Sequence, residues 1–278
     1  MSNQEWPIIT RSRLANDLQT LGIQVGDIVM LHVSVKSIGW IVGGPAVVIQ
    51  ALLDVLKSEG TLVMLVGWED YPYELPKWPE EKQKAYLQEC PPFDPETSRA
   101  NREWSILTEY LRTWTGSYRS NHPDKSFAAV GAQARWLTAD QPLDNGYGIG
   151  SPLAKLCKAG GKVLQIGAPL NSLTLLHYAE YLTQVPDKRT VRYRMPILSE
   201  GKRIWIEIEE LDSSEGIVNW EGDDYFNLIG RAFIESEKVR SGEVGKAQAH
   251  LFDARMLTEF GKQWMEREFV EKEKPHDR

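Results

Sequence analysis

The sequence predicts a single α/β domain with a mixed central β-sheet, flanked by helices and carrying antiparallel strands toward the C-terminus. Apolar runs of strand length alternate with segments of helical periodicity from residue 11 to residue 166. The continuous apolar run 62–66 is typical of a parallel strand that is buried on both faces. From residue 191 onward, two strand-like segments flank the turn-like centre 199–202, which predicts a hairpin.

The N-terminal part of the chain predicts two β-α-β steps. Apolar residues at helical spacing follow Thr10, a residue type that caps helix N-termini, so we expect a first helix over 11–21. The turn 25–27 leads from this helix into a strand. The elements that follow are a strand at 28–33, a helix at 45–56 that ends near Gly60, and a strand at 62–66.

Residues 68–98 interrupt the alternation and are interpreted as an insertion at a substrate site. Prolines at positions 72, 76, 79, 91, 92 and 95 prevent a regular element over the whole segment, although the charged stretch 80–89 is long enough for a short helix. Long insertions of this kind form lids or substrate walls.

The alternation resumes after the insertion. Ser151 followed by Pro152 is a typical helix start, because serine caps the first turn and proline fits its first position. We expect a helix at 102–112, a strand at 127–130, a helix at 151–158, a strand at 162–166, hairpin strands at 191–198 and 203–209, and helices at 223–236 and 253–268. Residues 1–270 then form one domain, and 271–278 form a disordered charged tail.

Composition disfavours several functional classes. The 32 basic and 39 acidic residues give a net charge of −7, which argues against nucleic acid and is compatible with a cationic ligand or with ordinary solubility. Cys90 and Cys157 are too few for a disulfide framework or a cysteine-based zinc site, and the acidic residues lack metal-ligand spacing. Without an apolar span or signal sequence, we expect a cytoplasmic protein with no metal and no membrane partner.

The segment 167–180 carries the strongest candidate for catalysis. Thr174, His177 and Glu180 follow a strand-like run and share one face of the predicted helix, because residues three or four apart are neighbours on a helix. An imidazole near the end of a sheet strand lies where catalytic groups are common, so His177 is a candidate general base. A helix-packing histidine beside a solvated glutamate is the alternative.

Three further groups of residues suggest ligand binding. The loop 31–44 and the loop 119–127 bring hydroxyls and cations to element ends, which suits a phosphate, although ordinary turns explain both loops equally well. The first loop lacks the G-x-x-x-x-G-K-[ST] and G-x-G-x-x-G motifs, which disfavours nucleotide hydrolysis and dinucleotide redox chemistry. Acids beside aromatics at 68–73, 93–95 and 221–225 suit a polycationic sugar, or are simply exposed acids.

Several motifs together resemble the aminoglycoside 3-N-acetyltransferase family, over residues 14–269. These motifs are LHVSVKSIGWIVGG at 31–44, GWEDYPY at 67–73, PPFDPETSRA at 91–100, RSNHPDKSFAAVG at 119–131, GYGIGSPLAKL at 146–156 and LNSLTLLHYAE at 170–180. The segments at 67–73 and 91–100 resemble the gentamicin-modifying branch in particular.

The resemblance implies acetyl transfer from acetyl-CoA to the 3-amino group of 2-deoxystreptamine aminoglycosides, which confers antibiotic resistance, on a fold unrelated to the GNAT acetyltransferases. It implies that His177 is the base and that Thr174 lies beside the reacting carbonyl. Glu180, Glu221, Asp223 and Asp224 remain alternatives for the carboxylate that orients the imidazole.

The resemblance also implies two sets of binding residues. The residues implied for CoA are His32, Val33, Ser34, Val35, Lys36, Ser37, Arg119, Ser120, His122, Ser126 and Phe127. The residues implied for the aminoglycoside are Trp68, Glu69, Asp70, Tyr73, Asp94, Asp223 and Asp224.

Two other functions stay open at this stage. The first is a CoA-dependent N-acetyltransferase that acts on a non-antibiotic amine, and the second is a non-catalytic polycation-binding protein. Direct transfer is expected, because no activated serine or cysteine adjoins His177 in the sequence. The protein is expected to be a monomer or a homodimer.

Overall fold

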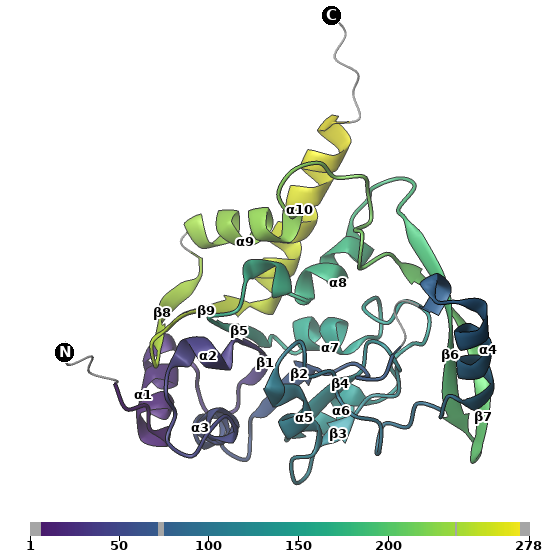
Figure 1. Cartoon of the computed structure of the whole chain (residues 1–278). Coiled ribbons are helices and arrows are strands. Elements are labelled where there is room, and N and C mark those ends of the chain that lie inside the picture. Colours follow the sequence, from purple (N-terminus) through teal and green to yellow (C-terminus); the bar gives the residue numbers. More distant parts are fainter. Residues whose placement is uncertain (1–6, 72–74, 237, 273–278) are drawn as a thin grey trace, which may run out of the picture.

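A seven-stranded mixed β-sheet forms the centre of the molecule (Figure 1). The computed structural model describes residues 7–71, 75–236 and 238–272. In spatial order the strands are β3 (Tyr118–Arg119), β4 (Phe127–Gly131), β2 (Thr61–Leu65), β1 (Ile28–Val33), β5 (Lys162–Ile166), β9 (Ala247–Asp253) and β8 (Arg240–Val244). The central strand β1 pairs in parallel with β2 and β5, and the outer strands join antiparallel. The predicted mixed α/β sheet is therefore confirmed.

Helices cover both faces of this sheet. The first face packs against α1 (Arg11–Leu21), α3 (Ala46–Leu56) and α5 (Ile106–Arg112). The second face packs against α6 (Ala134–Thr138), α7 (Pro152–Lys158), α8 (Leu175–Leu182), α9 (Tyr225–Glu235) and α10 (Ala254–Lys272). Val29 and Leu31 of β1 belong to the first core and Met30 to the second, so alternation directs His32 to the second face, the one that α8 covers.

A separate hairpin stands beside the main sheet. Strands β6 (Thr190–Ser199) and β7 (Lys202–Leu211) pair along their whole length, and Glu200 and Gly201 between them have φ of 49° and 73°, as a tight hairpin turn requires. The helix α4 (Glu80–Glu89) lies alongside this hairpin (Figure 1). Trp68 and Phe93 of the 68–98 insertion pack with Met195 and Ile208 of the hairpin in a third apolar cluster.

Several predicted elements match the structure to the residue, and one was misplaced. The helices at 11–21 and 80–89 and the strands at 28–33 and 162–166 have the expected bounds. The helix expected over 102–112 begins only at Ile106, because the Ser105 hydroxyl caps it by accepting a hydrogen bond from Leu107 N, and 102–104 form a turn. The remaining short elements are α2 (Val35–Ile38), η1 (Leu75–Lys77) and η2 (Leu170–Ser172).

The C-terminal region also differs from expectation. Strands β8 and β9 were not predicted, although they complete one edge of the main sheet. Helix α10 continues to Lys272, two residues into the segment expected to be a tail, and residues 273–278 lie outside the described part of the chain. Among the helices that the structure describes, none has both the length and the apolar character needed to cross a bilayer.

A buried ionic network joins the hairpin to the main sheet. Lys125 Nζ lies 2.9 Å from Asp124 Oδ2 and also pairs with the carboxylate of Glu210 on β7. The Tyr193 hydroxyl on β6 donates to the same Glu210 carboxylate. Burial alone would lower the pKa of Lys125, but the two carboxylates outweigh it and the pKa is raised, so the ammonium stays charged.

We expect Lys125→Met to destabilise the fold by about 3–5 kcal/mol, because it leaves buried carboxylates without their cation. Urea unfolding followed by circular dichroism measures this loss. Arg192→Met is the matched control, since its ion pair with Glu209 on the same hairpin is exposed, and it should change the unfolding midpoint very little. Equal effects of the two substitutions would contradict the role of the network.

Candidate active site

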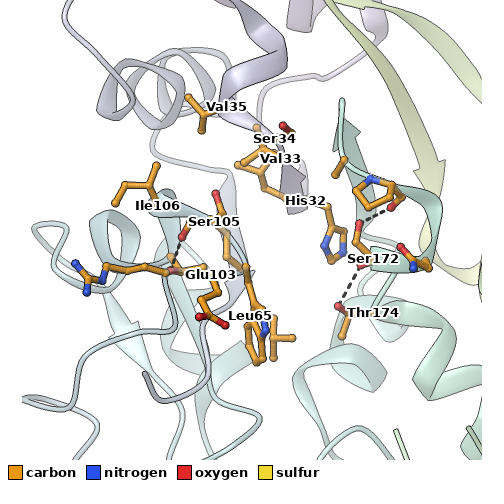
Figure 2. Close-up of a pocket in the computed structure, with 18 of the residues that line it drawn as sticks. His32, Val33, Ser34, Val35, Leu65, Glu103, Ser105, Ile106, Ser172 and Thr174 are labelled. Carbon is orange, nitrogen blue, oxygen red and sulfur yellow. Dashed lines mark hydrogen bonds between the residues drawn. The ribbon is translucent and has the colours of Figure 1, made fainter. Parts of the chain in front are cut away.

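A cavity of about 800 Å³ opens at the carboxyl ends of β1, β2 and β5. Its walls come from residues 31–36, from 64–65, from the segment 102–108 and from the loop between β5 and α8. Figure 2 shows Glu103 and Ile106 on the opposite side from Ser172 and Thr174, with His32 projecting from the end of β1. Open α/β sheets bind their ligands at this edge.

His177 faces the cavity from α8 in a fixed orientation. Its Nδ1 lies 2.7 Å from Glu180 Oε2, one helical turn further along the chain. Its ring stacks on Tyr147 with centroids 4.9 Å apart and planes 4° apart, and Phe226 contacts it at 4.8 Å. The carboxylate and the two aromatic rings hold the imidazole, and Nε2 is the nitrogen left for a ligand.

Glu180 is itself fixed inside the protein. Only 1% of it is exposed, and its second oxygen, Oε1, accepts a hydrogen bond from the Tyr225 hydroxyl on α9. Burial and the Glu180 charge raise the pKa of Tyr225 well above its usual range, so this hydroxyl keeps its proton and donates. Both carboxylate oxygens therefore have partners.

The structure identifies which acidic residue contacts the imidazole. Glu180 makes the contact, whereas Asp223 pairs with Arg231 and Asp224 accepts a hydrogen bond from Phe226 N as the N-cap of α9. Glu221 lies on the surface.

Thr174 and the start of α2 also line the cavity. Thr174 precedes the first residue of α8, and its Oγ1 donates to Ser172 O at 3.4 Å. Residues 32–36 contribute to the wall, whereas Ser37 does not, because its hydroxyl turns back to Ser34 O at 2.7 Å. These backbone and hydroxyl groups are suited to the polar parts of an elongated ligand.

The segment 102–108 forms a wall that the sequence did not indicate. Trp104 and Ile106 remain 43% and 40% exposed while lining the cavity. Gly67 makes room for the indole, because a Cβ at this position, where φ is +51°, would lie 2.6 Å from the Trp104 ring. Tyr147 is a further lining residue that was not predicted, whereas Asp124 belongs to the loop 119–127 that was implied for CoA. Trp104 was not found because it lies within the helix expected over 102–112, where a tryptophan is by default assigned to the core.

The second loop implied for CoA, 119–127, holds the protein together instead of lining the cavity, except at Asp124. Arg119 donates to the carbonyls of Gly67 and Ser98 and to the Ser126 hydroxyl. His122 Nδ1 accepts from Lys125 N at 3.0 Å, and burial lowers the pKa of His122 to about 3, so the ring is neutral. The other two predicted residues of this loop, Ser120 and Phe127, are fully buried.

The acids implied for the aminoglycoside are held by other protein groups. Glu69 pairs with Arg102 at 2.9 Å and Asp70 with Arg99 at 2.7 Å. Asp94 accepts hydrogen bonds from its own turn, and Trp68 is buried in the third apolar cluster. None of these side chains lines the cavity, whose carboxylates are Glu103 and Asp124. Tyr73 lies outside the described residues.

The two cysteines do not indicate a thiol nucleophile, and the described residues do not form a cluster of metal ligands. Cys90 and Cys157 are buried, and burial raises the pKa of both thiols. Over residues 7–71, 75–236 and 238–272, no group of three or more His, Cys, Asp or Glu side chains is placed to hold a metal ion.

Comparison with known proteins shows that the chain is similar to acetyltransferases. Residues 30–266 match the family model for aminoglycoside 3-N-acetyltransferases. The aminoglycoside N(3)-acetyltransferase III of Pseudomonas aeruginosa is 46% identical over 261 residues, which cover 94% of each chain.

Solved structures agree with the sequence comparison. The structure of AAC-IIIb in a binary complex with CoASH is 43% identical, has a TM-score of 0.87, and matches 94% of this chain and 97% of its own. The structure of AAC-VIa bound to sisomicin is 37% identical, has a TM-score of 0.88, and matches 94% and 98%.

Proposed function

The chain belongs to the aminoglycoside 3-N-acetyltransferase family, and from this we propose that it transfers the acetyl group of acetyl-CoA to the 3-amino group of a 2-deoxystreptamine aminoglycoside. Acetylation removes a positive charge from the antibiotic and so confers resistance. The observation that carries the proposal is the His177–Glu180 pair at the wall of a cavity of about 800 Å³.

The acetyl-CoA arm lies along residues 32–36. This segment includes the end of the central strand β1 and the first turn of α2. It lines the same cavity as His177. A family member has been solved with CoASH bound, which supports a CoA site on this fold. The thioester then reaches the neighbourhood of Thr174 and His177.

His177 is the general base of the transfer. An aminoglycoside amine arrives mostly protonated, and it must lose a proton before or during its attack on the thioester carbonyl. His177 Nε2 accepts this proton, and the Glu180 carboxylate at Nδ1 stabilises the imidazolium that forms. Attack places negative charge on the carbonyl oxygen, and the Thr174 hydroxyl, which lines the same cavity as His177, stabilises this charge when it turns away from Ser172 O. The tetrahedral intermediate then expels the CoA thiolate, which takes the proton that His177 holds.

The transfer is direct. The cavity hydroxyls of Ser172 and Thr174 donate to backbone carbonyls, to Pro169 O and Ser172 O respectively, and neither is hydrogen-bonded to His177. A serine or threonine nucleophile needs such a base beside it. Trapping a labelled acetyl group on the protein in the absence of an acceptor would contradict this step.

The acceptor site is formed by Glu103, Asp124 and Trp104. Carboxylates in the cavity wall pair with ammonium groups, and an exposed indole covers the apolar face of a sugar. A relative of the same fold has been solved with sisomicin bound, which supports an aminoglycoside as the acceptor.

CoA release, followed with a thiol reagent, tests the function. Purified protein is mixed with acetyl-CoA and gentamicin, kanamycin, apramycin or no acceptor. We expect turnover with drugs that carry a 3-amino group and none without an acceptor. If the protein binds CoA but acetylates none of these drugs, its acceptor is another amine. If it does not bind CoA, the enzyme assignment is wrong.

We expect His177→Ala to lower kcat at least ~100-fold while leaving CoA affinity unchanged, since a general base contributes about this much. Steady-state kinetics and calorimetry measure the two quantities. His250→Ala is the control, because His250 is half-buried on β9 and does not line the cavity. Activity of His177→Ala within a few-fold of the wild type would remove this histidine from the mechanism.

Glu180→Gln should lower kcat at least ~10-fold with little change in KM, because the imidazolium loses its charged partner while the shape is kept. Glu221→Gln is the matched control, because Glu221 was another candidate for the carboxylate that orients the imidazole but is exposed on the surface. If Glu221→Gln lowered kcat as much as Glu180→Gln, the orienting role of Glu180 would be wrong.

Glu103→Gln should raise the aminoglycoside KM about fivefold and leave kcat nearly unchanged, since a partly exposed ion pair contributes up to about 1 kcal/mol to ground-state binding. The increase should shrink at high salt. Asp70→Asn serves as control, because Asp70 pairs with Arg99 outside the cavity. A kcat effect alone would contradict a binding role for Glu103.

A further inference from the structure

Two buried polar atoms on neighbouring strands have no hydrogen-bond partner. They are His32 Nε2 on β1 and Gln165 Oε1 on β5. The two residues are paired in the parallel register, so their side chains leave the same face of the sheet next to each other. Because an unpaired buried polar group costs about 1–3 kcal/mol, two such atoms side by side call for a common explanation.

The other end of the Gln165 side chain is anchored. Its Nε2 donates to Pro169 O at 2.8 Å, and the Ser172 hydroxyl donates to the same carbonyl at 2.7 Å. This anchor fixes which end of the amide is the oxygen, so Oε1 is directed as an acceptor only. Gln165 thereby supports the loop that carries Ser172 and Thr174 into the cavity (Figure 2).

His32 supplies the matching donor. Burial lowers the pKa of His32 to about 4, so the ring is neutral near pH 7 and has one N–H and one bare nitrogen. The hydrogen bond that satisfies both unpaired atoms is Nε2–H to Gln165 Oε1. It leaves Nδ1 of this cavity-lining residue as an acceptor.

We propose that Gln165 is a positioning residue that holds His32 in its Nε2–H tautomer, so that His32 Nδ1 accepts a hydrogen bond from an N–H of the reacting amine. The part that concerns the amine rests on the proposed function. His32 lies on the face of the sheet that α8 covers, and both it and His177 line the cavity. A neutral acceptor orients the amine without stabilising its ammonium form, which a carboxylate would do, and His177 remains the group that takes the proton.

The tautomer is measured directly in the ligand-free protein. Histidine labelled with ¹⁵N gives well-separated resonances for protonated and bare ring nitrogens, and the loss of one pair of signals in His32→Asn assigns this residue. We expect a single Nε2–H tautomer for His32 that does not change between about pH 6 and pH 8. An Nδ1–H tautomer, or a ring that is protonated in this range, would overturn the proposal.

Variants then test the role of Gln165. Gln165→Leu, which is apolar and of similar size, should convert His32 to a mixture of tautomers and lower kcat/KM roughly fivefold to tenfold, the usual effect of losing one hydrogen bond. Gln248→Leu is the control, since this side chain is exposed on β9, and it should change neither. An unchanged His32 tautomer in Gln165→Leu would refute the positioning role.

Substitutions of His32 test the acceptor. Asn Oδ1 takes approximately the place of Nδ1, so His32→Asn should retain more activity than His32→Leu, and the difference should appear in kcat/KM for the amine. Equal losses in the two variants would show that Nδ1 accepts no hydrogen bond from the substrate. If the wild type has the Nε2–H tautomer but transfers no acetyl group to any acceptor, the proposed function fails while the Gln165–His32 contact stands.

Discussion

The arrangement of the site depends on a buried carboxylate that has a partner at each oxygen. Taking the Glu180 charge out of water is unfavourable unless hydrogen bonds replace those of the solvent. His177 supplies one and the Tyr225 hydroxyl supplies the other. Because Tyr225 begins α9 while the other two residues lie on α8, the orientation of the imidazole requires both helices to be in place. The geometry at His177 is therefore a property of the folded second core and not of one helix alone.

A second buried network reaches the same imidazole through the Tyr147 ring that stacks on it. The Tyr147 ring that stacks on His177 also lies 5.2 Å from Lys125 Nζ, which pairs with Asp124 and Glu210. Tyr147 thus stands between the ion pairs that attach the hairpin and the His177 imidazole. Asp124 belongs both to that network and to the cavity wall, so its carboxylate links the buried ion pairs to the cavity.

Interactions between residues close in sequence were predictable, and those between distant residues were not. The three-residue spacing placed His177 and Glu180 on one helix face, although it did not single out Glu180 among the acids that could contact the imidazole. The apolar run 162–166 indicated β5 with its exact bounds. The acids at 69 and 70 were expected to face a ligand, but their arginine partners at 102 and 99 come some thirty residues later. No local pattern shows such a pairing, nor that Trp104 and Asp124 converge on one cavity, because tertiary packing decides both.

The third apolar cluster has a consequence for how this protein can vary. Trp68, Cys90, Phe93, Met195 and Ile208 form a unit that shares no member with the two cores against the main sheet. Substitutions in separate clusters are close to additive in their effect on stability. The residues of this cluster can therefore diverge together with little effect on the two main cores, whereas Tyr193 and Glu210 of the hairpin remain tied to Lys125 beside the Tyr147 ring that stacks on His177.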